Sequence, residues 1–198
     1  MPSAFSSVQT QSGKIFLVGG LVKDLVLKQT YRIDENLLYE EMMVMKTGRF
    51  CTPIALVNDR YILAAGGQIT PSNKGNYYTN ASEVYDIVTN VWTTTGSMAK
   101  PRGNTSMTAI GNFVFIFQGL LPQLQASQTS AMEFINLGSC AQQSLRNAVW
   151  EQTTVQNPDF VNNEPRGSHL LGNNEIIVFG GTGNFTYSVD VSTVVLGE

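Results

Sequence analysis

A short apolar run that ends in glycine recurs along the chain, and this repetition constrains the fold more than any other feature. The clearest copy is YILAAGG at residues 61–67. When the last glycine of each copy is aligned, the four copies are separated by 47, 52 and 62 residues. Repeats of this length indicate one structural unit per copy, as in propellers and other repeat architectures. The glycines concerned are Gly19, Gly20, Gly66, Gly67, Gly119, Gly180 and Gly181.

Other residues recur in step with these glycines. Arg49, Arg102 and Arg166 precede the last glycine of their copies by 18, 17 and 15 residues. Aromatic residues recur between the glycines and the arginines, with Tyr31 aligned with Tyr85. Repetition in register is typical of residues that hold a fold together, so we expect these aromatic residues and glycines to have structural roles. The other aromatic members are Trp92 in the second unit and Phe134 and Trp150 in the third.

Each unit has the pattern of four short strands. In the second unit they are expected at 51–57, 60–67, 81–87 and 91–96, which are rich in β-branched and aromatic residues and bounded by Asn, Asp, Gly or Pro. No helix is needed to complete the unit. The corresponding strands are expected at about 4–10, 14–20, 28–34 and 38–45 in the first unit, and at about 104–110, 113–119, 130–136 and 149–154 in the third.

A four-stranded antiparallel sheet cannot bury both of its faces alone, so units of about 50 residues are expected to stand face to face around an axis. The sequence therefore predicts an all-β propeller of about four blades in a single domain. The blades are expected at about 1–48, 49–101, 102–165 and 166–198, with the last one incomplete.

The second unit resembles a kelch repeat. It has Gly66 and Gly67, then the pair Tyr85 and Asp86, then Trp92 seven residues after the tyrosine, and then Arg102. The other units depart from this pattern. The first has Leu38 in place of the tryptophan and Phe5 in place of the arginine, while the third has Gln118 in place of the first glycine and an insertion before Trp150. The resemblance implies a kelch-type β-propeller, a family whose members usually close with five to seven blades.

The glycine pair has a physical explanation in such a fold. The second strand of each blade lies deep in the structure, and a residue without a Cβ permits both a close approach of the neighbouring blade and a positive φ. The tyrosine and tryptophan rings are expected to fill the wedge between blades.

The two ends of a four-blade arc are expected to expose an apolar blade face and an edge strand, which favours association. Three arrangements would cover them: the sequence is a segment of a longer propeller, other chains supply the missing blades, or the four blades close on themselves. We favour the first of these. In all of them we expect other protein chains as partners, including one that completes or covers the propeller.

Contacts with partners are expected on the face that carries the long loops. Lys74, Tyr77 and Tyr78 are the best candidates, because rigid amphipathic rings are enriched at binding hot spots; the alternative is that the loop packs its own tyrosines. Arg49, Arg102 and Arg166 begin the inner strands near this face. In some kelch receptors such arginines converge on acidic peptides, but their recurrence in register favours a structural role.

Composition and motifs argue against several functions. Charged residues make up 14% of the chain and the net charge is -3, so nucleic acid is not an expected partner. The sequence has no run of 18 apolar residues and no secretion signal at its start, which predicts a cytoplasmic protein without membrane insertion. Its single histidine, His169, excludes a multi-histidine metal site, and Cys51 and Cys140 are interpreted as plain thiols. We expect no cofactor, metal or catalytic residue.

These features favour a non-catalytic interaction module or scaffold, within a larger assembly such as a cytoskeletal or ciliary complex. One alternative is the substrate-recognition propeller of a ubiquitin ligase, which typically carries a helical BTB or F-box segment that this sequence lacks. Another is a small-molecule kelch enzyme of the mutarotase or specifier type. Such an enzyme is expected to converge several acidic, basic or tyrosine side chains in a ligand-sized central pocket.

Overall fold

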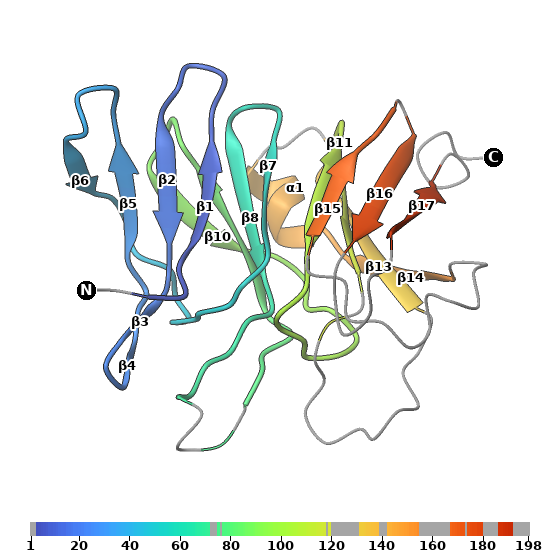
Figure 1. Cartoon of the computed structure of the whole chain (residues 1–198), viewed down its shortest axis with the longest axis horizontal. Coiled ribbons are helices and arrows are strands. Elements are labelled where there is room, and N and C mark those ends of the chain that lie inside the picture. The colour runs from blue at the N-terminus through green and yellow to red at the C-terminus, as the bar shows by residue number, and fades with distance from the viewer. Residues whose placement is uncertain are drawn as a thin grey trace.

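The chain folds as an all-β propeller of four small antiparallel sheets, as the sequence predicts (Figure 1). The structure is a computed structural model that describes residues 3–71, 75, 77–117, 119, 131–138, 142–154, 167–172, 174–179 and 186–191. Successive sheets stand side by side, and contacts join the inner strands of blades 1 and 2, of blades 2 and 3, and of blades 3 and 4.

Each blade is a meander of strands in chain order. Blade 1 consists of β1 (Ser6–Gln9), β2 (Ile15–Val18), β5 (Thr30–Ile33) and β6 (Tyr39–Glu41), and blade 2 of β7 (Ile54–Val57), β8 (Tyr61–Ala65), β9 (Ser82–Asp86) and β10 (Val91–Thr94). Blade 3 consists of β11 (Met107–Ile110), β12 (Phe113–Ile116), β13 (Ala131–Asn136) and β14 (Trp150–Thr154). The described part of blade 4 consists of β15 (Gly167–Leu170), β16 (Glu175–Phe179) and β17 (Thr186–Asp190).

Two segments differ from the expected all-strand units. The loop after β2 forms a small hairpin of β3 (Leu21–Val22) and β4 (Leu25–Val26). The insertion before Trp150 forms a short helix, α1 (Gln142–Asn147), so the prediction that no helix is needed was wrong for this unit. The helix forms there because Leu145 is buried in the core that blades 2 and 3 share.

Strand β8 explains why the central apolar runs are continuous rather than alternating. All five of its residues are buried, because blade 2 is covered on both faces. Ile62 and Ala64 pack against blade 1, whereas Tyr61, Leu63 and Ala65 belong to the core shared with blade 3.

Two tryptophans tie their blades to the preceding blade in the same way. The indole Nε1 of Trp92 donates a hydrogen bond to Thr30 Oγ1 at 3.1 Å, and that of Trp150 donates one to Ser82 Oγ at 2.8 Å. Thr30 and Ser82 hold equivalent positions at the start of the third strand of blades 1 and 2. The ring of Tyr85 lies beside Trp92, with centroids 5.2 Å apart.

The ladder register differs from the predicted alignment at two aromatic positions. Tyr85 pairs with Trp92 across β9 and β10, and the equivalent pairs are Ile33 with Tyr39 and Ile135 with Trp150. Tyr31 therefore lies two residues before the position that Tyr85 occupies, and Phe134 lies one residue before it. Turns of different geometry after the third strand caused this shift, which spacing alone could not reveal.

The close approach at the glycine pairs is present. Gly66 has a φ of +66°, and a Cβ built on it would collide with the carbonyl oxygen of Arg102. Gly19 has the same φ, and a Cβ there would collide with the carbonyl oxygen of Arg49. Each arginine thus lies in the linker that crosses the end of the preceding blade. None of the helices in the described part of the chain is long and apolar enough to span a bilayer.

Candidate binding site at the propeller axis

Arg49 is an internal clamp rather than a surface group. Its side chain is 0% exposed and forms an ion pair with Glu83, with Nη2 at 2.7 Å from Oε1. Its Nη1 donates to the carbonyl oxygens of Gly66 at 2.8 Å and Ala81 at 2.9 Å. The Glu83 carboxylate also accepts two backbone N–H bonds from the linker, from Lys46 at 2.8 Å and from residue 47 at 3.1 Å.

Arg102 repeats this clamp one blade later. It pairs with Glu133 of β13, and the other carboxylate oxygen of Glu133 accepts a hydrogen bond from the backbone N–H of Ala99 at 2.7 Å. The backbone carbonyl of Arg102 accepts a hydrogen bond from Gly67 at 2.8 Å. Each clamp therefore joins a blade linker to the third strand of the following blade and to the glycine pair of the preceding one.

Burial makes Arg49 and Arg102 unsuitable for binding a partner. Burial lowers the pKa of both guanidinium groups, and the paired glutamate opposes this by favouring the charged form. The hypothesis that these two arginines form an exposed ring for an acidic peptide was therefore wrong. Arg166 lies outside the described residues. It also directly precedes its strand β15, whereas Arg49 stands five residues before β7 and Arg102 five before β11.

The glutamate partners were missed by sequence reasoning, although a signal was present. Glu83 and Glu133 each stand two residues before the last aromatic or aliphatic position that pairs with a tryptophan, Tyr85 and Ile135 respectively. An acidic residue repeated in register with a repeated arginine predicts a buried pair, since an unpaired buried charge is costly.

The described pocket nearest the axis is built from three equivalent turns. Ala4, Cys51 and Asn104 stand shortly before the inner strands of blades 1, 2 and 3, and all three have positive φ, between 48° and 53°. The backbone N–H of Cys51 donates to the carbonyl of Ala4 at 3.1 Å, and that of Asn104 donates to the carbonyl of Cys51 at 3.2 Å. These bonds link the three blades where their inner strands begin.

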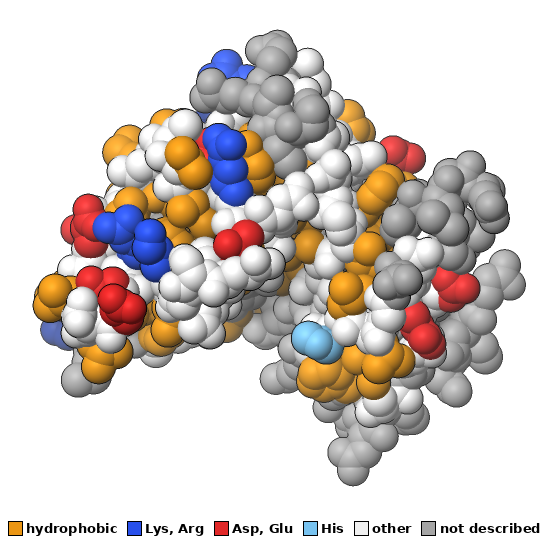
Figure 2. All heavy atoms as spheres, turned by 90° about the horizontal axis from the view of Figure 1, so that it is seen from above, with side chains coloured by type: hydrophobic (Ala, Val, Ile, Leu, Met, Phe, Trp, Pro, Cys, Tyr) orange, Lys and Arg blue, Asp and Glu red, His pale blue; other side chains and the backbone are white. Residues whose placement is uncertain are grey.

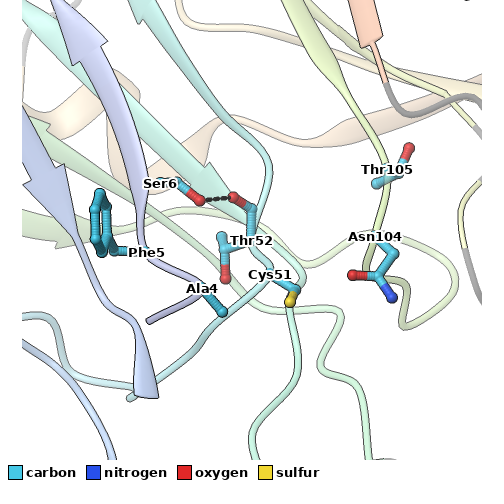
Figure 3. A pocket seen from close by; sticks show the side chains of 7 residues that line it. All are labelled: Ala4, Phe5, Ser6, Cys51, Thr52, Asn104 and Thr105. Carbon is cyan, nitrogen blue, oxygen red and sulfur yellow. Dashed lines mark hydrogen bonds between the residues drawn. The ribbon is translucent and has the colours of Figure 1, made fainter. Parts of the chain in front are cut away.

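The pocket between these turns is open and has a volume of about 280 Å³ (Figure 3). Ser6 donates a hydrogen bond from its hydroxyl to the carbonyl of Thr52, while Asn104 and Thr105 face them from the next inner strand (Figure 3). Its lining offers hydroxyl, amide and thiol groups and one aromatic ring, and no acidic or basic side chain. The lining residues are Ala4, Phe5, Ser6, Cys51, Thr52, Asn104 and Thr105.

The two tyrosines proposed for partner contact differ in their surroundings. Tyr77 is 58% exposed, and its backbone N–H donates to Thr70 Oγ1 at 3.2 Å within the same loop. Tyr78 is half-buried, with its ring so close to Gly103 that a Cβ there would lie 2.7 Å from Cδ1. Tyr77 therefore stays a candidate contact residue, whereas Tyr78 packs within the fold. Lys74 lies outside the described residues.

His169 lies on β15 opposite Ile177, as a strand residue, but its side chain is exposed rather than buried as expected. Among the described residues, no three His, Cys, Asp or Glu side chains gather in a way that could hold a metal ion. Cys51 lines the axial pocket, and Cys140 lies outside the described residues.

Comparisons with known proteins support the fold alone. No family model and no curated protein matches the chain. Among solved structures, that of YjhT, a propeller, aligns with 91% of this chain at a TM-score of 0.69 and 13% sequence identity. The alignment covers 59% of the YjhT chain, so this chain spans about three fifths of its length.

Proposed function

We propose that the chain is a kelch-type propeller that acts as a non-catalytic protein-binding module, or scaffold, in a cytoplasmic assembly of the cytoskeletal or ciliary kind. The kelch assignment is supported by Gly66 and Gly67, Trp92 and Arg102, which occur in the order of that repeat and make the contacts that hold adjacent blades together. Partner binding is assigned to the face that carries the long loops.

The lining of the axial pocket is the observation that carries the proposal. An enzyme of the mutarotase or specifier type is expected to place several charged or tyrosine side chains around a bound small molecule. The described lining offers none, and the two arginines nearest this face are each paired with a buried glutamate. A pocket of about 280 Å³ also lies at the lower limit of small-molecule sites.

Tyr77 is the residue through which the proposal can be tested. Rigid tyrosine rings give contact area at a small cost in conformational entropy, and Tyr77 projects from the loop face without packing into a blade core. Its matched control is Val88, which is 72% exposed in the turn between β9 and β10, at the opposite end of blade 2.

The experiment is to purify the tagged chain from its native cells and to identify copurifying proteins by quantitative mass spectrometry. We expect a defined set of partner proteins that is retained with Val88→Ala and reduced at least fivefold with Tyr77→Ala. Recovery of the chain without any stoichiometric partner would contradict a scaffold function. Recovery of partners that both variants retain equally would move the binding site away from Tyr77.

A further inference from the structure

One outer face of the arc is a blade-packing surface that no other blade covers in the structure. We call it the head face; it belongs to blade 1 and consists of Ile15, Leu17, Tyr31, Ile33 and Tyr39. In the ladder register, Ile15, Leu17 and Ile33 are equivalent to Ile62, Ala64 and Tyr85 of blade 2. Those blade 2 residues pack against blade 1 and are fully buried. The head face is thus built for the same kind of contact.

Exposure confirms that the head face is open. Tyr39, which stands at the position of Trp92, is 77% exposed, and Ile15, Leu17 and Ile33 are only half-buried. The rings of Tyr31 and Tyr39 lie edge to face with centroids 6.3 Å apart, which extends the apolar surface to the outer strand.

The opposite end of the arc has a second open surface, which we call the tail face. It belongs to blade 4 and consists of His169, Ile177, Phe179, Thr186 and Ser188, which lie on the side of the sheet away from blade 3. Phe179 is 43% exposed, whereas Ile176 and Val178 on the other side are fully buried against blade 3. Figure 2 shows the molecule from the side of the hairpin turns, with His169, the one histidine of the chain, on the right-hand part, across a notch from the left-hand part.

The two faces carry complementary halves of the contact between blades. Thr186 pairs with Phe179 and so holds the position of Thr30 and Ser82, whose hydroxyls accept hydrogen bonds from the tryptophans of the following blades. Tyr39 holds the tryptophan position on the head face, and its phenol can donate a hydrogen bond to such a hydroxyl. The tail face supplies the acceptor and the head face supplies the donor.

We propose that two copies of this chain associate head to tail, with the head face of each copy covering the tail face of the other in a closed ring of eight blades. One chain carries both halves of the contact, so a second copy satisfies both at once and the assembly closes. Eight blades lie within the range of known propellers. Four faces, each of strands about 4.8 Å apart and about four residues long, bury on the order of 1,000 Å² or more, near the lower limit of specific interfaces.

Sedimentation of the chain at about 10 µM tests the proposal, which does not depend on the proposed function. We expect a species of twice the chain mass of 21.6 kDa. Leu17→Glu on the head face and Ile177→Glu on the tail face should each raise the dissociation constant by more than roughly 100-fold, because each buries an unpaired carboxylate. Val88→Glu, at an exposed turn, should leave the dimer intact. Circular dichroism of each variant checks that it remains folded.

Mixing the two variants separates this arrangement from other dimers. The head variant keeps its tail face and the tail variant keeps its head face, so the mixture should recover a heterodimer with one intact contact. A dimer made of two head faces would not be recovered by mixing, and this result would overturn the proposal. A wild-type chain that remains monomeric at this concentration would overturn it as well, including a monomer whose own ends meet.

Discussion

Removal of the Arg49 side chain should destabilise the fold far more than removal of an exposed arginine. In Arg49→Met the Glu83 carboxylate remains 2% exposed without its cation, and the carbonyl oxygens of Gly66 and Ala81 lose their donor. Loss of one partner of a buried pair costs about 3–5 kcal/mol. A domain is stable by only about 5–15 kcal/mol, so the variant should unfold at markedly lower denaturant concentration.

The chain offers a matched control in Arg32, which pairs with Glu40 on the surface of blade 1, where the two side chains are 34% and 59% exposed. Exposed pairs contribute about 0–1 kcal/mol, so Arg32→Met should cost less than 1 kcal/mol. Urea unfolding followed by tryptophan fluorescence measures both variants. If Arg49→Met costs no more than Arg32→Met, the buried clamp does not hold blade 2 to its linker and the reasoning is refuted.

Three further predictions concern the contacts between and within blades. Gly66→Ala should cost about 2 kcal/mol or more in urea unfolding, because its φ of +66° is unfavourable with a Cβ that also collides with the linker. Trp150→Phe should cost about 1–3 kcal/mol in the same assay, because it leaves the Ser82 hydroxyl without its 2.8 Å donor; an unchanged midpoint would contradict this. Hydrogen bonds from Arg60 lower the pKa of Asp86 from 3.8 to about 2, so the stability that ionised Asp86 contributes is present above pH 4 and lost as the pH falls through about 2. Asp86→Asn should therefore cost on the order of 1 kcal/mol at pH 6 and almost nothing at pH 2, and a cost that is independent of pH would contradict the assignment.

Much of the fold could be predicted from the sequence because the strand signals are local. The apolar run at 61–65 and the turn at 58–60 fix β8 and its hairpin to within about one residue, and the glycine pair after it marks the point where the next linker crosses. The helix α1 could not be predicted, since Leu145 becomes part of the core only after blades 2 and 3 meet.

The candidate site was harder to predict because its key property is burial. The spacing of Arg49 and Arg102 identified them as repeated residues, but their exposure depends on Glu83 and Glu133, which come from strands more than 30 residues away. The axial pocket depends on positive φ at residues such as Ala4 and Cys51, where the sequence has no glycine to indicate it.

Hydrogen exchange in β8 tests the central claim most directly, because that strand is covered by a blade on each side. The account predicts that the amides of residues 61–65 exchange only through global unfolding, with a protection free energy equal to that measured in urea, while residues 39–41 of the edge strand β6 exchange much faster. Exchange in residues 61–65 as fast as in residues 39–41 would show that the blades do not form one core.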